Sequence, residues 1–410
     1  MNNGNKEFDD IRPFRDAEVA PVIERLLHNE ALVHILIQLQ FPVVSRYIER
    51  PLAKLVQRRI ARHLQGVKTI ADFQQLMYQF VGNVIQKSTN GFSWSGIENL
   101  DPDLSYVFIS NHRDITLDSA LLNYVLMTLK MHTAEIAIGD NLLTNPLVSD
   151  LMRLNKSFVV KRSVPGLKAK LVALTELSEY ISQSRAQGNS IWIAQREGRA
   201  KDGCDRTDPA IIKMLHIHNK KQHVPFAESM SRLNIVPVAI SYEYDPCDLL
   251  KANELNARAE DHYVKGENED VESILRGIAL PKGRVHIHFG APLQEEYANA
   301  DDVAEAIDKA IVDGYHLFPS NVIAYEQLQA LRDAMNNLQE ESRQKLQNVA
   351  QMARQFVAGF DSQDLALHAN EFSARVAGYP KKLQSLILEM YANPLLSKFQ
   401  YEQQNPHQPA

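Results

Sequence analysis

The spacing of hydrophobic positions changes twice along the chain. Up to about residue 91 the apolar residues recur at helical spacing, as Val19, Val22, Ile23 and Leu26 do. Between residues 96 and 320 short apolar runs alternate with helical stretches, and from residue 321 to about 393 the helical spacing returns. We therefore predict an N-terminal helical region at 1–95, an α/β domain at 96–320, and a C-terminal helical region at 321–410 that ends in a disordered tail.

The middle region predicts a mixed α/β sheet with covering helices, because strands and helices alternate along it. Strands are expected at 106–109, 135–138, 158–160, 190–193, 235–240 and 285–289. Helices are expected at 118–130, 146–154, 167–186, 270–276 and 301–312. The longer segments 201–231 and 245–279 are mostly polar, and we expect them to be loops at one edge of the sheet.

Composition narrows the class of protein. A net charge of -6 argues against a general nucleic-acid binder. The only two cysteines, Cys204 and Cys247, lie in no CxxC or metal-like spacing, which fits a reducing compartment. The first ten residues lack the apolar core of a signal peptide, and the apolar run 31–44 is shorter than the roughly 20 residues that cross a bilayer. We expect a cytoplasmic protein; peripheral contact with the inner face of a membrane, through 37–44, is the alternative.

His112 is the first candidate for chemistry. The apolar run 106–109 ends in a polar turn, so His112 is expected at the carboxyl end of a strand, where open α/β sheets place their ligands. Asp118 is expected in the first turn of the next helix, where the helix dipole favours a carboxylate. A histidine can act as a general base while a carboxylate fixes its tautomer. Asp114 competes with Asp118 for this role, and alone the pattern fits an ordinary turn histidine equally well.

Two cationic turns could bind a phosphate. Lys161 and Arg162 follow an apolar run, and the planar guanidinium of Arg162 can bind two oxygens at once. After the run 190–193 comes a second turn, with Glu197, Gly198, Arg199 and Lys201. Gly198 lets a ligand approach the backbone closely. Each turn alone fits a solvated charged loop better than a binding site.

Taken in order, these segments resemble the glycerolipid acyltransferase superfamily, which includes lysophosphatidate and glycerol-3-phosphate acyltransferases. Asn111-His112 through Asp118 resembles the NHxxxxD block, and 156–162 resembles the second block. Glu197-Gly198-Arg199 is similar to the Glu-Gly-Thr-Arg block, and Val236-Pro237-Val238 is similar to the fourth. The chain departs from the pattern in three places. His112 and Asp118 are six residues apart rather than five, Lys156 replaces a glycine, and no residue separates Gly198 from Arg199.

The resemblance implies acyl transfer from an acyl thioester, either acyl-CoA or acyl carrier protein, to the hydroxyl of a phosphorylated glycerol. The expected acceptor is 1-acyl-sn-glycerol-3-phosphate. His112 is expected to deprotonate the acceptor while Asp118 orients the imidazole. The expected phosphate-binding residues are Arg162 and Arg199, with Lys161, Lys201, Glu197 and Gly198 in support.

Neither a metal nor a bound cofactor is implied, and no nucleic-acid partner is expected. The alternatives are acyl transfer to glycerol-3-phosphate or to another lysolipid or amino-lipid, and a lipid-binding scaffold without activity. A third, more distant hypothesis is a phosphatase that uses the histidine as its nucleophile.

Overall fold

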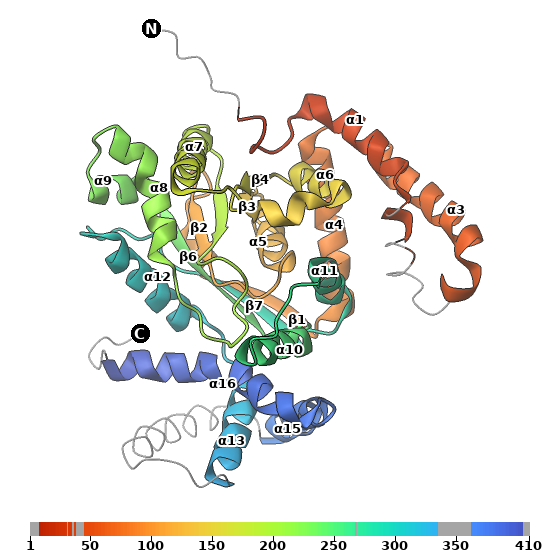
Figure 1. Ribbon diagram of the computed structural model, residues 1–410, viewed down its shortest axis with the longest axis vertical. Coiled ribbons are helices and arrows are strands. Elements are labelled where there is room, and N and C mark those ends of the chain that lie inside the picture. Colours follow the sequence, from red (N-terminus) through yellow and green to blue (C-terminus); the bar gives the residue numbers. More distant parts are fainter. Residues whose placement is uncertain are drawn as a thin grey trace.

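The computed structural model describes residues 8–30, 32–34, 37, 45–266, 269–334 and 362–404 (Figure 1). The strands are β1 (Gly91–Ser95), β2 (Val107–Ser110), β3 (Glu135–Gly139), β4 (Ser157–Val160), β5 (Ile191–Ala194), β6 (Ile235–Tyr242) and β7 (Arg284–Phe289). The helices are α1 (Asp16–Leu27), α3 (Ser45–Leu64), α4 (Ile70–Ser88), α5 (Leu117–Thr128), α6 (Pro146–Leu154), α7 (Leu167–Ala186), α8 (Pro209–Lys221), α9 (Phe226–Ser231), α10 (Asp248–Ala259), α11 (Glu269–Ala279), α12 (Ala300–Gly314), α13 (Pro319–Ala334), α15 (Ser362–Ala377) and α16 (Lys381–Gln404), with short 3-10 turns at Ile97–Asn99 and Asp140–Thr144.

The strands form one mixed sheet in the order β1-β7-β6-β2-β5-β3-β4. β6, β2, β5, β3 and β4 are parallel, whereas β7 pairs antiparallel with β6 and parallel with β1. The carboxyl ends of five strands therefore meet at one edge, which we call the carboxyl edge. The prediction of a mixed α/β sheet with covering helices is confirmed. The edge strand β1 was missed, because its alternating, half-exposed residues follow directly on α4.

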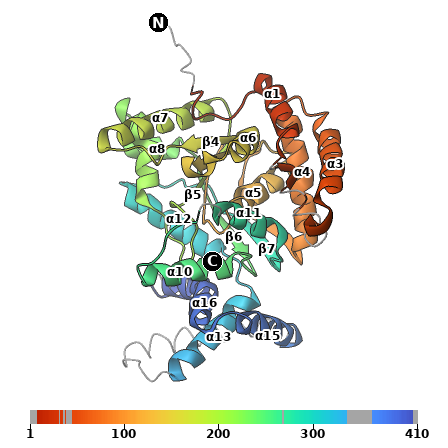
Figure 2. The same ribbon diagram turned by 45° about the vertical axis from the view of Figure 1, so that its right-hand side comes forward.

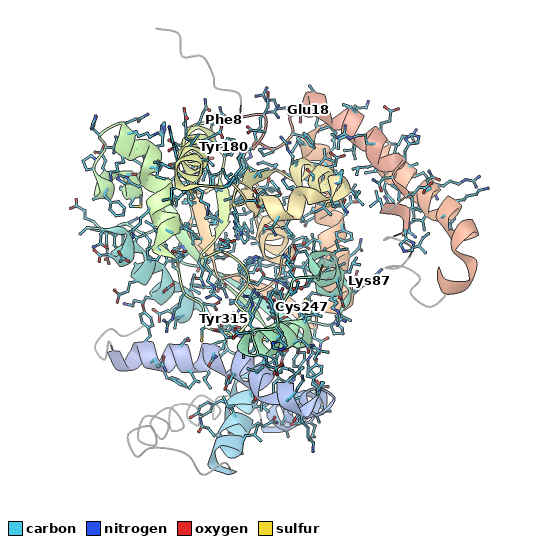
Figure 3. All side chains as sticks on the ribbon, viewed as in Figure 1. Phe8, Glu18, Lys87, Tyr180, Cys247 and Tyr315 are labelled. Carbon is cyan, nitrogen blue, oxygen red and sulfur yellow. The ribbon has the colours of Figure 1, made fainter. Side chains whose placement is uncertain are left out.

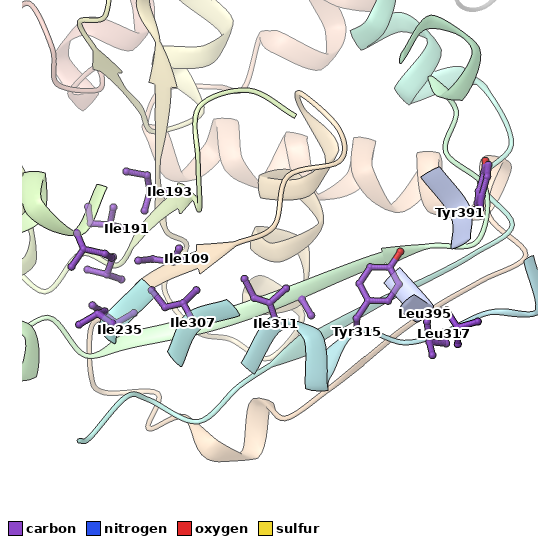
Figure 4. Close-up of a cluster of buried hydrophobic side chains, with 14 of the residues drawn as sticks. Ile109, Ile191, Ile193, Ile235, Ile307, Ile311, Tyr315, Leu317, Tyr391 and Leu395 are labelled. Atoms are coloured by element: carbon purple, nitrogen blue, oxygen red, sulfur yellow. The ribbon is translucent and has the colours of Figure 1, made fainter. Parts of the chain in front are cut away.

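Helices cover both faces of the sheet, and alternation along β2 shows the two sides. Val107 and Ile109 point into a core that α7, α8 and α12 cover, whereas Phe108 points into a core formed with α4 and α5. Figure 4 shows part of the first core, where Ile307 and Ile311 of α12 lie beside the isoleucines of β2, β5 and β6. β2 is thus buried on both sides, as expected for a central parallel strand.

The N-terminal helices form a separate layer around their own apolar cluster. That cluster joins α1, α3 and α4 to Leu147 and Leu154 of α6. α4 begins at a capping box, in which Thr69 accepts from the backbone of Asp72 and the Asp72 carboxylate accepts from the backbone of Thr69. Ahead of α1, Phe8 packs edge-on against Tyr180 of α7, with ring centroids 5.4 Å apart (Figure 3).

The C-terminal helices α13, α15 and α16 form a layer beside α10 and α12 (Figure 2). They share the first core with the sheet through Phe372, Leu388 and Tyr391. Asp248, at the start of α10, binds this layer: it lies 2.8 Å from Arg375 and accepts from the hydroxyls of Tyr379 and Tyr391. The boundaries expected at residues 95 and 320 remain predictions.

Several expectations about loops and ends were wrong. The segments 201–231 and 245–279 contain α8, α9 and α10 rather than loops alone, whereas α11 confirms the helix expected at 270–276. For α8 the sequence holds a start signal, since Asp208 caps the helix and Pro209 stands in its first turn. The tail expected to be disordered is helical as far as Gln404. The lipid-facing run 37–44 lies outside the described residues except for Ile37, which is buried. Within the described ranges, no helix is long and apolar enough to span a membrane.

Candidate active site

His112 lies at the carboxyl edge, in the turn between β2 and α5. Its side chain is 15% exposed, and its Nδ1 lies 2.8 Å from Oδ2 of Asp118. Because that carboxylate oxygen accepts, Nδ1 carries the proton and Nε2 has the free lone pair. Nε2 has no hydrogen-bond partner among the residues that the structure describes. The ring therefore has the tautomer that a general base requires.

Asp118 is fully buried in the first turn of α5, and four donors surround it. Oδ2 accepts from His112 and from the backbone N–H groups of Arg113 (2.6 Å) and Asp114 (2.9 Å). Oδ1 accepts from the hydroxyl of Tyr242 at 2.9 Å. These bonds stabilise the ionised carboxylate inside the protein and fix it beneath the imidazole.

Asp114, the competing carboxylate, caps the start of α5 instead. Its Oδ1 accepts from the backbone N–H groups of Thr116 (2.9 Å) and Leu117 (2.8 Å). Burial, and then the charge of Asp118, raises the pKa of Asp114. The one extra residue between His112 and Asp118, relative to the family's block, is therefore accommodated in a turn whose backbone N–H groups point at Asp118.

The turn that holds His112 is fixed to both neighbouring strands. Asn111 bonds reciprocally to the backbone of Ile240 in β6, at 3.0 and 2.8 Å. Trp192 of β5 donates to Ser110 at 3.0 Å, and its ring meets that of His112 edge-on at 5.8 Å. The imidazole is held by packing as well as by hydrogen bonds, as a preorganised base requires.

The turn after β5 lies directly beside His112. Ala200 donates its backbone N–H to the carbonyl of His112 at 2.8 Å, and Gly198 has a φ of 75°. Arg199 donates from one Nη to Ser273 of α11 at 3.3 Å, whereas its other Nη is buried with no hydrogen-bond partner among the residues that the structure describes. A buried, unsatisfied guanidinium nitrogen is costly, and a phosphate oxygen would satisfy it.

The other predicted phosphate-binding residues are less closely grouped. Arg162 lies 3.5 Å from Glu197, and these side chains are 34% and 74% exposed. Lys201 binds Glu254 at 2.6 Å. Lys161 binds Asp10, and Glu176 at 3.2 Å. The two lysines are thus occupied by carboxylates of this chain, while Arg162 and Arg199 face the carboxyl edge.

Several buried polar groups near His112 and Asp118, which we call the dyad, were not predicted from the sequence. Tyr242 lies 124 residues from Asp118, and burial together with that carboxylate raises its pKa well above the ordinary value, so its hydroxyl stays a donor. Burial would lower the pKa of Arg113, but Asp205, at 2.5 Å, raises it overall. Burial lowers the pKa of Lys282 to about 8. The strand pattern of β6, continued two residues past Ile240, would have placed Tyr242 at the carboxyl edge.

Among the described residues, no group of three or more histidines, cysteines or carboxylates is arranged to bind a metal ion. The three histidines of β7 and its neighbourhood illustrate this. His286 and His288 bind the hydroxyl groups of Ser93 and Ser95, and the ring of His316 packs at a tilt against that of His286, with centroids 4.9 Å apart. The structural role expected for His286 and His288 from the alternation along the strand stays a prediction.

Comparison with known proteins indicates the class of protein to which the central region belongs. Residues 92–241, which include most of β1, the His112 turn and most of β6, match the model of the acyltransferase family. All four sequence blocks lie within this region, so the resemblance that they carry is confirmed at the level of an acyltransferase domain.

The chain is also similar to the solved structure of the 1-acyl-sn-glycerophosphate (LPA) acyltransferase PlsC from Thermotoga maritima. The identity is 13% and the TM-score 0.36, with 72% of this chain and 92% of that chain covered. No curated protein sequence matches the chain. The family assignment rests on the match at residues 92–241.

Proposed function

We propose that the protein transfers a fatty acyl group from an acyl thioester, acyl-CoA or acyl carrier protein, to the free hydroxyl of 1-acyl-sn-glycerol-3-phosphate in phospholipid biosynthesis. The observation that carries the proposal is the pairing of His112 with a fully buried Asp118 beside the unsatisfied guanidinium of Arg199. A base and an anion-binding group so placed suit an acceptor that carries both a hydroxyl and a phosphate.

In the proposed reaction, Nε2 of His112 takes the proton of the acceptor hydroxyl as its oxygen attacks the thioester carbonyl. Asp118 stabilises the imidazolium that forms. The tetrahedral intermediate collapses, the C–S bond breaks, and the thiolate takes the proton back from His112. A positioned base contributes about 10²–10⁴-fold in rate, and holding alcohol and thioester together provides much of the rest.

Arg199 and Arg162 are the proposed phosphate-binding residues, since both guanidinium groups lie at the carboxyl edge. Glu197 and Gly198 shape the turn that carries Arg199. Lys161 and Lys201 are the weaker candidates, because both pair with carboxylates of this chain. Glycerol-3-phosphate, or another lysolipid or amino-lipid, is the alternative acceptor. A cytoplasmic protein that is peripheral to the inner face of the membrane, where such acceptors reside, is part of the proposal. The proposed reaction requires no cofactor; the acyl donor is its second substrate.

One experiment tests the donor and acceptor together. Purified protein is given acyl-CoA or acyl-acyl carrier protein with either glycerol-3-phosphate or lysophosphatidate, and the products are identified by mass spectrometry. His112→Ala should lower the rate at least about 100-fold. His262→Ala, which changes an exposed histidine after α10, should leave it unchanged.

The outcomes separate the rival functions. Release of thiol that depends on acceptor supports acyl transfer, and the acceptor that gains an acyl chain names the reaction. An inert protein that still binds lysophosphatidate indicates a scaffold. Phosphate release without any thioester indicates a phosphatase. Full activity of His112→Ala would contradict the assigned base.

A further inference from the structure

The start of α7 carries an exposed apolar surface that nothing in the described part of the chain covers. Leu167 is 88% exposed, Val172 62% and Leu171 58%. Leu167 and Leu171 are four residues apart, so they lie on one face of the helix, one turn after the other. Single exposed leucines are common, but three large apolar side chains in six residues form a patch. We call residues 164–172 the α7 tip.

The charge of the α7 tip is opposite in sign to that of the whole chain. Lys168 and Lys170 are exposed, and neither forms an ion pair with a described residue. No aspartate or glutamate occurs between residues 161 and 175, although the chain as a whole has a net charge of -6. Apolar side chains interleaved with unpaired lysines fit an anionic bilayer, in which leucines enter the interface and lysines meet headgroups.

The α7 tip lies at the same edge of the sheet as His112. β4 is parallel to the catalytic strand β2 through β3 and β5, so the connection from β4 to α7 leaves from the carboxyl edge. Arg162 lies in this connection and contacts Glu197, beside Arg199. A surface here would face the lipid from which the acceptor comes.

The α7 tip is also held firmly. Ser163 bonds to Asp140 through its backbone N–H (3.1 Å) and its hydroxyl (3.2 Å). Two turns further on, Leu177 and Ile181 anchor α7 in the first core, and α7 lies beside α8 (Figure 2). The exposed turns therefore project from a fixed helix, and binding requires no folding step.

We propose that the α7 tip is a membrane-docking surface that inserts Leu167, Leu171 and Val172 into an anionic bilayer while Lys168 and Lys170 bind lipid phosphates. Docking there sets the carboxyl edge, with Arg162 and the dyad, against the headgroup layer. The benefit to turnover rests on the proposed function, whereas affinity for the bilayer does not.

Sedimentation with vesicles tests the binding. Vesicles of phosphatidylcholine alone are compared with vesicles that also contain phosphatidylglycerol, at low and high salt. The wild-type protein should bind the anionic vesicles, and high salt should weaken this binding. Leu167→Ser with Leu171→Ser should weaken binding roughly 100-fold, and Lys168→Gln with Lys170→Gln about tenfold at low salt.

A matched double variant is the control. Leu104→Ser with Leu367→Ser changes leucines that are 52% and 57% exposed, outside the α7 tip, and should bind like wild type. Equal binding by the Leu167/Leu171 variant would overturn the proposal. So would a dimer in size-exclusion chromatography that this variant abolishes while its vesicle affinity stays unchanged.

Activity separates this inference from the proposed function. With a short-chain lysophosphatidate kept below its aggregation concentration, the Leu167/Leu171 variant should turn over like wild type. With a long-chain acceptor presented in anionic vesicles, it should be slower by the same factor as its loss of binding. If wild type turns over neither acceptor, the proposed function fails and the vesicle result stands by itself. Equal losses on both acceptors would contradict a role in docking.

Discussion

Tyr242 is the side chain beyond the dyad that most directly affects the proposed base. Tyr242 lies at the end of β6, and its hydroxyl donates to Oδ1 of Asp118 at a distance of 2.9 Å. Hydrogen bonds to charged groups contribute about 1.5–3 kcal/mol. We therefore expect Tyr242→Phe to lower kcat/KM about tenfold, because the carboxylate that orients His112 loses one of its four donors. Initial rates of thiol release measure the effect.

Tyr244 offers a matched control two residues further along. Its hydroxyl is buried and has no hydrogen-bond partner among the described residues, and burial raises its pKa to about 12. Tyr244→Phe removes the same atom without removing a bond, so its activity should stay as in wild type. Equal losses of kcat/KM in the two variants would show that the bond from Tyr242 to Asp118 has no specific role in activity.

At the scale of residues, the sequence predicted what is local. His112 and Asp118 are six positions apart in one turn, so a motif and a helix start were enough to pair them. Tyr242 reaches Asp118 only because β6 pairs with β2, and no spacing along the chain expresses that. The contact between Lys161 and Asp10 could not be predicted for the same reason, because these residues lie 151 positions apart in the sequence.

At the scale of elements, α11 packs against the His112 turn at a glycine. A Cβ on Gly277 would lie 2.2 Å from Oδ2 of the buried Asp114. Gly277→Ala must move α11 or the capping carboxylate, and such overpacking costs about 1–3 kcal/mol. We expect a lower urea midpoint and a lower rate, because Asp114 caps the helix that carries Asp118. Gly66→Ala, where a Cβ meets nothing within 4 Å, should leave both unchanged; equal effects would contradict this account.

The histidines where β7 meets β1 predict a response to acid. Burial, and then the neighbouring His316 and His288, lowers the pKa of His286 to about 4. An unfolded histidine has a pKa of about 6.5, so between these values only the unfolded chain binds the proton. The free energy of unfolding should therefore fall as pH drops from about 6.5 towards 4, through this group.

Urea midpoints at about pH 7 and about pH 5 test that prediction, since the two values bracket the unfolded pKa of histidine. His286→Gln should lose less stability between them than wild type, whereas His262→Gln, at an exposed position, should lose as much. Burial raises the pKa of Asp308 to about 6, so this carboxyl group has the opposite effect on the pH dependence of stability. It is present in all three proteins and therefore does not affect the comparison. An unchanged difference in His286→Gln would contradict a neutral, buried imidazole.

The helix α10 and the strand β1 were missed for the same physical reason, which is that neither buries a continuous apolar face. α10 buries Lys251 and Glu254 as well as Ala252, so its buried side is not an apolar stripe. Lys251 is accommodated by Asp245 and by the carbonyl of Arg113, partners that only the folded chain supplies. β1 has one covered and one open side in a short segment, whereas the fully buried β2 and β6 were found from their apolar runs.

At the scale of the molecule, Asp248 joins the C-terminal layer to α10. It is 1% exposed, and its ion pair with Arg375 and bonds to Tyr379 and Tyr391 all cross from α10 to that layer. Because the apolar core also continues across this boundary, we expect both parts to unfold as one unit. Breaking a buried ion pair is strongly destabilising, so Asp248→Asn should lower the free energy of unfolding by roughly 2–4 kcal/mol.

The two tryptophans make this prediction measurable. Trp94 in β1 and Trp192 in β5 both report on the sheet, which is distant in sequence from the layer that Asp248 binds. In urea, tryptophan fluorescence and far-UV circular dichroism should move together to a lower midpoint in Asp248→Asn. Glu272→Gln, which breaks an exposed pair with Arg276, should change the stability by less than about 1 kcal/mol. An early dichroism phase with unchanged fluorescence would show instead that the C-terminal layer unfolds alone, and would make residues near 320 a domain boundary.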